Sequence, residues 1–555
     1  MDADVKSLTL FCDENKIPYA IPETLNNLNL CTYAEHLTSV FAIFPATLKE
    51  IQIVISKIHE IKSTINKELA VYPISRGLNW GYGSATPTSA HAVLLSLAQF
   101  ENQISWIGNA FDPPGQPYGK KLGLVRVTAS VTQQQLYDFL QGEGGNFWMD
   151  ATGAPADSSI VGNYLERGFG HSEKGDHFRH VVGMEVVLPD GSFIKTGHAG
   201  CNNASNVGIH KHGIGPIVEG LFSQSSLGIV TAIYLELMPA KKCLSKFFIR
   251  LKSNEDFYEA VERLQPLKMK GTLSSQMHCI NSHKEIQAVM RYPFNDTGGK
   301  TPLPKATAQH ICKTLKISPW TISGAVYGDS WVEVWLKTFR LRKALRGVRC
   351  KKIILPEWVA DFAYQLFNAT LFRQLFPKIQ KKIDARLTVL KEMINLKKGI
   401  PTNYFMNSVY WRKRHFTMSE TRLNPDKDKV GMIWIAPIAP MTKEGVKKLV
   451  DISTSISEQY EFEPAISITL LNDKAADCIL SIIFDREIAE EEHNALICYD
   501  KLMEAFNAIG FTSYRASSRA MRKGQLNYSK ELAHLHKMLK TGLDPHNVFS
   551  PGHYL

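Results

Sequence analysis

A glycine-punctuated loop between two short apolar runs restricts the fold of this chain more than any other feature. Residues 71–75 and 93–97 each predict a β-strand, and the loop at 76–84 carries Gly77, Gly81 and Gly83. Glycine tolerates positive φ, and successive N–H groups in such a loop can surround an anion such as a pyrophosphate. The alternative is a plain glycine-rich turn. The loop is not a GxGxxG motif and leads into no helix, which disfavours a Rossmann nicotinamide site.

A second polar stretch, at residues 150–176, contains five glycines but is not of low complexity. A long loop of this kind inside a compact domain is usually either functional or disordered. Its small residues, together with Asn163, Arg167 and Asp176, suit an extended cofactor better than disorder.

Hydrophobic periodicity predicts helices and strands on both sides of a change in pattern near residue 240. Before it, residues 48–65 predict an amphipathic helix, 183–197 a hairpin around Asp190-Gly191, and 228–238 a strand. After it, 247–251, 466–470 and 479–484 predict strands, and 443–458 and 487–507 predict helices. Asn254 and Thr442 are the expected helix caps. This mixture predicts an α+β fold with a second α+β domain.

Five stretches, in the same order, resemble the family of FAD-linked oxidoreductases that includes vanillyl-alcohol oxidase and p-cresol methylhydroxylase. They are PISRGLNWGYGSATP at 73–87, GNYLERGFGHSEKGDHF at 162–178 followed by GMEVVLPDG, GPIVEGLFSQSSLGIVTAIYLELMPA at 215–240, the pair Tyr514-Arg515, and LDPHNVFSPG at 543–552. Any one of them is weakly specific, whereas the ordered set is specific. The match covers the first 240 and the last 45 residues well and the middle less well.

The resemblance implies a two-domain fold in which a cap with an antiparallel sheet covers the flavin ring. The expected division is an FAD-binding domain of the p-cresol methylhydroxylase type at 1–240, a cap or substrate domain at 241–505, and a segment at 506–555 that returns to the FAD domain.

The reaction typical of this family is oxidation of a para-substituted phenol at its benzylic carbon, with hydride transfer to FAD and a quinone methide as intermediate. The phenol ionises on binding, and a phenolate needs hydrogen-bond donors and positive charge in a dry pocket. The resemblance assigns this catalytic role to Tyr82, Tyr514 and Arg515. The other possibility is a flavin enzyme of the same fold with a non-phenolic substrate.

The resemblance places the expected cofactor contacts in four parts of the chain. They are Ser75, Arg76, Gly77, Leu78, Asn79, Gly81, Tyr82, Gly83, Ser84, Asp150, Ser159, Gly162, Asn163, Arg167, Gly168, His171, Gly175, Asp176, Gly228, Ile229, Val230, Arg515 and His553.

Three positions depart from the family pattern. Met432 stands where vanillyl-alcohol oxidase has the histidine that bonds FAD, so we expect non-covalent FAD, with Tyr410 as the one candidate for a covalent link. Gly153 stands where the family has an active-site aspartate, with Asp157 as a possible substitute. In the family, that aspartate helps water add to the quinone methide, so its loss disfavours hydroxylation of the substrate. Desaturation, ether cleavage and oxidative decarboxylation can start from the same intermediate. His553 replaces the usual Lys or Arg near the flavin.

Composition narrows the choice of partners. The chain has 64 Lys and Arg against 53 Asp and Glu, a net charge of +11. The main basic run, 340–352, contains no aromatic residue that could stack on bases, so we expect no nucleic-acid partner. The expected partners are a small phenolic or related substrate, oxygen or a cytochrome as electron acceptor, and a second copy in a homodimer.

The sequence also predicts where the protein resides. Nine scattered cysteines without a CxxC pair, and no zinc-like spacing, indicate a reducing compartment and no metal. The acidic N-terminal residues do not resemble a signal peptide, and no run of 18 apolar residues occurs. We therefore expect a cytoplasmic protein without a membrane partner.

Overall fold

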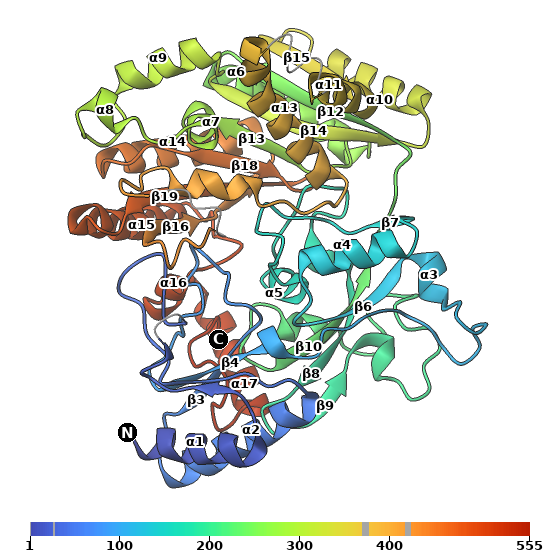
Figure 1. Cartoon of the computed structure of the whole chain (residues 1–555), viewed down its shortest axis with the longest axis vertical. Coiled ribbons are helices and arrows are strands. Elements are labelled where there is room, and N and C mark those ends of the chain that lie inside the picture. Colours follow the sequence, from blue (N-terminus) through green and yellow to red (C-terminus); the bar gives the residue numbers. More distant parts are fainter. Residues whose placement is uncertain (1, 26–27, 369–376, 417–422) are drawn as a thin grey trace.

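Three β-sheets and the helices packed on them organise the chain, as Figure 1 shows for the computed structural model. The structure describes residues 2–25, 28–368, 377–416 and 423–555. The two smaller sheets belong to residues before 240 and lie in the lower half of Figure 1, while the large sheet and most later helices form the upper half.

The first sheet holds the strands on either side of the glycine loop. Its order is β1-β2-β4-β3, in which β2, β4 and β3 are parallel and β1 is antiparallel. These strands are Tyr19–Ala20, Phe41–Ile43, Ala92–Ser96 and Ala70–Ile74. The predicted helix at 48–65 is α2 (Leu48–Thr64), which Thr47 caps by accepting from the Glu50 N–H at 3.2 Å. Helix α1 (Ala3–Asn15) packs on α2.

The second sheet is antiparallel and contains the predicted hairpin. Its order is β5-β6-β10-β8-β9, with bounds Ile104–Trp106, Leu124–Thr128, Ile229–Glu236, Val181–Val187 and Phe193–Lys195. Gly191 turns the β8–β9 hairpin with a φ of 82°, as the Asp190-Gly191 pair predicted. A separate two-stranded ladder joins β7 (Phe147–Trp148) to β11 (Met238–Pro239).

The third sheet has eight strands and confirms the expected antiparallel cap sheet. Its order is β15-β12-β14-β13-β18-β19-β16, with β17 paired to β19. The bounds are Cys350–Pro356, Cys243–Leu251, Trp320–Gly328, Met277–Asn281, Ile466–Leu470, Ala475–Asp485, Val430–Ile435 and, for β17, Ile438–Pro440.

One face of the cap sheet is an apolar core, and the other face packs on Ala360 and Ile394 at one end and, at His278, on His171. Helices α6 (Asn254–Met269), α10 (Trp331–Ala344), α14 (Lys443–Gln459) and α15 (Ala489–Ala508) supply core residues together with alternate strand positions. Thr442 caps α14 as predicted. The predicted cap Asn254 is wrong, because Ser253 accepts from the Asp256 N–H at 3.1 Å and Asn254 begins the helix.

The remaining helices surround the sheets. They are α3 (Tyr118–Leu122), α4 (Gln133–Gly142), α5 (Ile160–Leu165), α7 (Ser282–Val289), α8 (Phe294–Thr297), α9 (Lys305–Leu315), α11 (Glu357–Asn368), α13 (Pro377–Lys397), α16 (Ser518–Arg522) and α17 (Lys530–Leu543).

The C-terminal segment returns to the first sheet, where α17 and the C-terminus lie near β3 and β4 in Figure 1. The Val71 N–H donates to the Val548 carbonyl at 2.7 Å, and the Ser550 N–H donates to the Val71 carbonyl at 2.8 Å. Earlier in the same segment, the Tyr514 N–H donates to the Ala436 carbonyl beside β17. The segment therefore joins the first sheet to the edge of the cap sheet.

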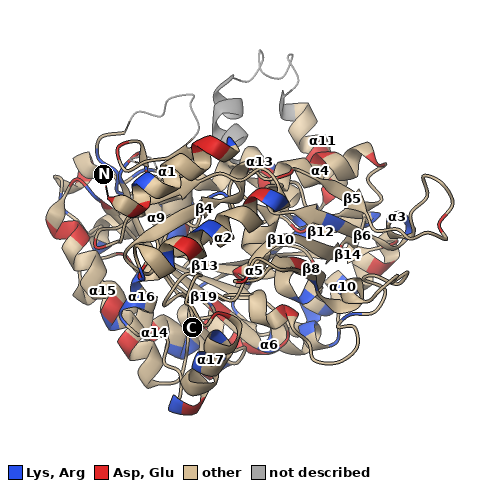
Figure 2. Cartoon of the chain, turned by 90° about the horizontal axis from the view of Figure 1, so that it is seen from below, with Lys and Arg blue, Asp and Glu red and all other residues tan. Residues whose placement is uncertain are grey.

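The surface charges are mixed. Figure 2 shows basic and acidic residues interspersed over the elements rather than gathered on separate faces. Among the described helices, none combines the length and the apolar character needed to cross a bilayer.

The buried carboxylate of Asp544 fixes the C-terminal segment, so its loss should destabilise the protein. Asp544 accepts from the N–H groups of Val548 and Phe549, at 2.8 and 2.9 Å, and from the Lys540 ammonium at 2.8 Å. We expect Asp544→Ala to lower the free energy of unfolding by about 3 kcal/mol, because it leaves a partly buried ammonium without its counter-charge. Urea unfolding followed by circular dichroism measures this, and an unchanged midpoint would contradict it. The exposed Glu531→Ala on α17 is the control, with a change below about 0.5 kcal/mol.

Candidate functional site

The glycine loop lies between the cap and the C-terminal segment. Gly81 has a φ of 77°, and a Cβ there would lie 3.1 Å from the Trp434 ring of β16. Gly83 has a φ of 126°, and a Cβ there would overlap the Ser518 hydroxyl. These two positions exclude side chains because two other parts of the chain press against the loop. The close approach seen at these two glycines is to other side chains of the chain, and the predicted approach of the loop to a ligand stays a prediction.

Tyr82, at the centre of the loop, is buried between an indole and a guanidinium. Its ring meets Trp434 edge-on at 5.6 Å, and the Arg515 guanidinium carbon lies 4.5 Å from its ring centre. The Tyr82 hydroxyl has no hydrogen-bond partner among the described residues. Burial first, and neighbouring Tyr514 second, hold the pKa of Tyr82 well above its ordinary value. The raised pKa keeps this hydroxyl protonated, so it can act as a hydrogen-bond donor.

Arg515 is fixed by groups from the glycine loop and the polar stretch. It donates through Nε to Glu166 at 3.2 Å and through a terminal nitrogen to the Asn79 side-chain oxygen at 2.6 Å. Burial alone would raise the pKa of Glu166, but Arg515 first and His553 next lower it to about 2. His553 lies 3.7 Å from the other Glu166 oxygen. The structure thus brings two predicted residues, Arg515 and His553, onto the Glu166 carboxylate, and a third, Asn79, onto Arg515.

The sequence prediction missed Glu166, although Glu166 is next to Arg167, which was predicted to contact the cofactor. Arg167 instead donates to the Ser223 hydroxyl at 3.0 Å. An enclosed arginine often pairs with a nearby acid, so the need of Arg515 for a counter-charge was the available signal.

Tyr514 lies against the edge of the cap sheet, close to an acid that the sequence did not reveal. Ile438 of β17 pairs with Asp477 of β19, and the neighbouring Ala436 carbonyl receives the Tyr514 N–H. Burial first, and Asp477 second, raise the pKa of Tyr514. Asp477 is fully buried, and neither carboxylate oxygen has a partner among the described residues. Burial raises the pKa of Asp477 well above its ordinary value.

The predicted contact Asp150 holds the polar stretch in shape. Its carboxylate accepts from the N–H groups of His171 and Ser172, at 3.2 and 2.5 Å, and contacts His177 Nε2 at 2.6 Å. Burial opposes ionisation, but the bonds from His177 and Ser172 outweigh it and leave the pKa of Asp150 below its ordinary value. The other ring nitrogen of His177 contacts the predicted Asn163 at 2.6 Å. These residues position the loop through bonds to one another.

The remaining predicted residues fall into three groups. Ser75 and Gly162 touch, because a Cβ on Gly162 would overlap the Ser75 hydroxyl, which brings the glycine loop to the start of α5. Asp176 forms a β-bridge with Phe169 where the polar loop begins and ends. The His171 ring lies 4.2 Å from the ring of His278 in the cap, tilted by 38°. Those that remain lie on the same loops or strands: Arg76, Gly77, Leu78, Ser84, Ser159, Gly168, Gly175, Gly228, Ile229 and Val230.

The two positions considered for covalent flavin attachment lie in one apolar cluster with Trp80. Met432 is buried on β16, and its carbonyl accepts from the Thr32 hydroxyl at 2.7 Å. The Tyr410 hydroxyl donates to Asp428 at 2.5 Å, and burial and that hydrogen bond raise the pKa of Tyr410.

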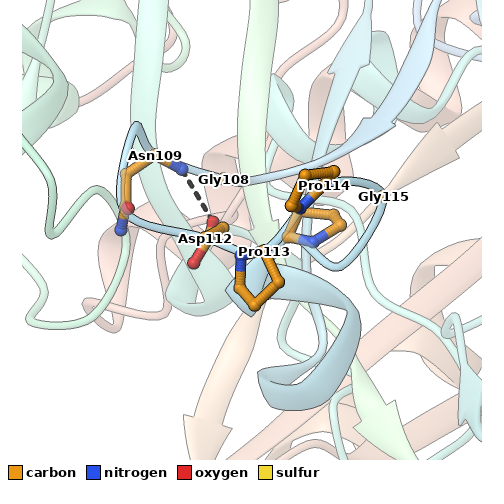
Figure 3. Close-up of a pocket in the computed structure, with 7 residues that line it drawn as sticks. Gly108, Asn109, Asp112, Pro113, Pro114 and Gly115 are labelled. Carbon is orange, nitrogen blue, oxygen red and sulfur yellow. Dashed lines mark hydrogen bonds between the residues drawn. The ribbon is translucent and has the colours of Figure 1, made fainter.

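A separate surface hollow of about 380 Å3 lies on the 108–117 turn (Figure 3). The Asn109 N–H donates to Asp112 at 2.8 Å across it, and prolines form much of its wall. It contains none of the predicted site residues. In the described ranges, no group of three or more His, Cys, Asp or Glu is arranged to hold a metal ion.

Three buried polar groups beside the glycine loop lack partners among the described residues, as a site for a bound cofactor would require. The Tyr82 hydroxyl, the Trp434 indole N–H and the Asp477 carboxylate are buried and without partners in the described part of the chain. Buried polar groups are rarely left unsatisfied unless a ligand, ion or water completes them. Together with the glycine loop, these groups fit a bound ligand that offers polar atoms.

The unpartnered Asp477 should make stability depend on pH. The pKa of Asp477 is higher in the folded protein than in the unfolded protein. The wild type therefore loses stability as the pH rises from about 4 through the pKa of the folded state. Asp477→Asn should therefore be more stable than the wild type at pH 8, by about 1–3 kcal/mol, with a smaller difference at pH 5. Thermal unfolding of the purified protein at both pH values measures this. Asp473→Asn, on the same hairpin, is the control, and an equal change at both pH values would contradict the prediction.

Comparisons with known proteins agree with this geometry. Residues 41–197 match the FAD binding domain family. The chain is 30% identical over 487 residues to a 1'-carboxy-chondrochloren decarboxylase from Chondromyces crocatus, which covers 87% of this chain and 85% of that protein. It is 25% identical over 524 residues to the flavoprotein subunit of a hydroxylating 4-cresol dehydrogenase from Pseudomonas putida, covering 94% and 88%.

A solved structure shows the same fold. The 4-ethylphenol oxidase from Gulosibacter chungangensis, in an isoeugenol complex, superimposes with a TM-score of 0.84 at 19% identity and covers 100% of this chain and 98% of that one. The expected α+β fold and the FAD cofactor are thereby confirmed. The chain belongs to the p-cresol methylhydroxylase and vanillyl-alcohol oxidase family of FAD-linked oxidoreductases.

Proposed function

We propose that this FAD-dependent oxidoreductase removes a hydride from the benzylic carbon of a para-substituted phenol, leaving a quinone methide. The observation that carries the proposal is the convergence of the Tyr82 ring, Tyr514 and the Arg515 guanidinium where the glycine loop, the cap edge and the C-terminal segment meet. When bound, FAD supplies the two-electron acceptor. The proposed domains are 1–240, 241–505 and 506–555, with oxygen or a cytochrome as final acceptor.

The proposed catalytic residues stabilise the phenolate. The Tyr82 and Tyr514 hydroxyls donate to its oxygen, and both stay protonated because burial raises their pKa values. Arg515 adds a permanent positive charge behind the Tyr82 ring. In a pocket closed to water these dipoles and charges are already oriented, so they favour the anion without reorganisation.

Asp477 is the proposed acceptor of the phenolic proton. Its carboxylate is buried beside Tyr514, and no described residue occupies its oxygens. Transfer of the phenolic proton to the Asp477 carboxylate neutralises that buried carboxylate. The negative charge then lies on the phenolate oxygen, beside the Tyr82 and Tyr514 hydroxyls. Because burial raises the pKa of Asp477, this carboxyl group is ionised, and so able to accept the phenolic proton, only as the pH rises toward that pKa.

Non-covalent FAD is part of the proposal. A methionine thioether at 432 is not expected to form that tether, because it has no proton to lose and a bond to its sulfur would leave a charged sulfonium. Tyr410 is engaged by Asp428, and its raised pKa disfavours the phenolate needed for attack. Asn79 and Glu166 hold Arg515, and the glycine loop and polar stretch are the proposed cradle for the dinucleotide.

The phenolate role of Arg515 predicts a selective loss of activity. Anaerobic addition of 4-ethylphenol should bleach the flavin of the wild type. The double variant Arg515→Met, Glu166→Gln removes both charges of this ion pair. Glu166 is then not left as a carboxylate without its arginine. We expect flavin reduction to slow about 100-fold or more while FAD content is retained.

Stopped-flow absorbance measures that rate, and Arg340→Met, an exposed arginine of α10, is the control. Absence of bleaching in the wild type would contradict phenol oxidation. Equal loss of FAD and of activity in the double variant would contradict the phenolate role.

A second candidate is oxidative decarboxylation, which the 30% identical decarboxylase favours. Hydride loss from 3-(4-hydroxyphenyl)propanoate gives a quinone methide with the carboxylate on the next carbon. When the C–CO2 bond breaks, its electron pair forms the vinyl double bond and the quinone methide becomes a phenolate. One hydride thus leaves and one CO2 is released, with no further oxidant.

The product distinguishes the two reactions. If decarboxylation operates, 3-(4-hydroxyphenyl)propanoate yields one 4-vinylphenol and one CO2 for each flavin reduced, measured by chromatography in a single anaerobic turnover. Retention of the carboxylate in the product would contradict decarboxylation while leaving phenol oxidation intact. Incubation without enzyme is the control.

A further inference from the structure

Two helices of the cap, α10 and α11 in the upper part of Figure 1, present large apolar side chains to solvent. On each helix these side chains recur at a spacing of four residues, which places them along one side of it. They are between 42% and 68% exposed, and we call them the aromatic patch: Trp331, Val332, Trp335, Leu336 and Phe339 of α10, and Trp358, Phe362 and Leu366 of α11.

A hollow of about 700 Å3 joins the two helices. It is lined by Trp331 and Trp335 of α10, by Trp358 of α11, and by Ile354 of β15, the edge strand of the cap sheet. The Trp335 ring also stacks on Phe339, with 5.9 Å between ring centres. The exposed side chains therefore gather around one hollow. Such a patch marks a contact with a protein or a membrane, whereas single exposed apolar residues are ordinary.

The basic run at 340–352 continues the aromatic patch. It contains seven Lys and Arg and no Asp or Glu. Arg342 lines the same hollow, and Arg340, Lys343 and Lys351 are exposed. Within the described ranges, the one ion pair formed by this run joins Arg349 to Asp256. Most of its positive charge is therefore available to an anionic surface.

The acids near the patch do not neutralise this charge. Residues 331–368 contain eight basic and three acidic residues. Of the acids, Glu333 bonds Lys337 and Glu357 bonds Lys398, which leaves Asp361 on α11. A symmetric contact with a second copy of the chain would set the same surface against itself and bring two basic runs together. The charge thus favours an anionic occupant over a second copy.

We propose that the aromatic patch and the basic run bind the surface of an anionic lipid membrane. Three of the chain's nine tryptophans line the hollow, and tryptophan is enriched where head groups meet acyl chains. Lys and Arg beside such rings attract acidic head groups, and helices that lie on a membrane combine both kinds of residue. The inference is independent of the proposed reaction.

The sequence prediction of no membrane partner rested on the lack of a long apolar run that could span a bilayer. A helix that lies on the membrane surface does not need such a run, because only one of its faces enters the interface. The exposed faces of α10 and α11 depend on how these helices pack on the cap sheet.

Sedimentation with vesicles tests the proposal on the holoenzyme. We expect the wild type to sediment with vesicles of equimolar phosphatidylcholine and phosphatidylserine, and much less with phosphatidylcholine alone. Trp331→Ser combined with Trp335→Ser should lower the partition coefficient about 10-fold or more, because two rings no longer enter the interface. Phe111→Ser combined with Ile214→Ser changes two exposed apolar residues outside the patch and is the control, with no change in partition.

A second variant tests the role of charge. Arg340→Gln, Arg342→Gln and Lys343→Gln together should weaken binding to the phosphatidylserine vesicles about 10-fold or more. The FAD content and circular dichroism of every variant should match the wild type, since all the changed side chains are exposed.

Four results would overturn the proposal. They are no sedimentation of the wild type with either vesicle, equal binding to both vesicles, unchanged binding of the tryptophan variant, and equal weakening by the control variant. The first of these leaves an acidic protein or a second copy as the occupant of the patch. Sedimentation velocity identifies the second copy, because the tryptophan variant would then convert a wild-type dimer into a monomer.

Discussion

The fixed position of Arg515 is the interaction on which the rest of the site depends. Its guanidinium bonds Glu166 and Asn79 and packs on the Tyr82 ring, so one side chain joins the polar stretch, the glycine loop and the C-terminal segment. A planar guanidinium with several donors suits such a junction, whereas a lysine would supply a point charge without the same directions. Because these contacts fix the cation, the buried tyrosines face a defined electric field.

The cap sheet has two roles because its strands alternate. Phe247, Met277, Ile468 and Cys478 enter the apolar core, and the positions between them lie on the opposite face. That second face carries Asp477, Thr469 and His278 in one row and Lys246 beyond it. Leaving polar groups unsatisfied destabilises the free protein, and the same groups give a bound ligand its orientation.

The sequence predicted local structure well where the signal is local. The α2 helix, the β8–β9 hairpin and the Thr442 cap depend on periodicity and on neighbouring residues, and the structure has all three. The cap of α6 was misplaced by one residue, because Ser253 and Asn254 are both good caps and only the backbone conformation decides between them. Glu166 and Asp477 were missed because an acid in a helix end or strand is usually exposed, and only packing shows that Asp477 is buried and that Glu166 pairs with Arg515.

The sequence by itself determined the FAD-linked family, the glycine loop and the identity of the tyrosine–arginine pair, since each is written in contiguous residues whose backbone needs are local. The tertiary structure alone decided what surrounds them. Arg515 and Glu166 are separated by 349 positions, and Asp477 reaches Tyr514 only through the pairing of β17 with β19. Charge compensation and burial are properties of groups brought together across the chain, so no single segment could specify them.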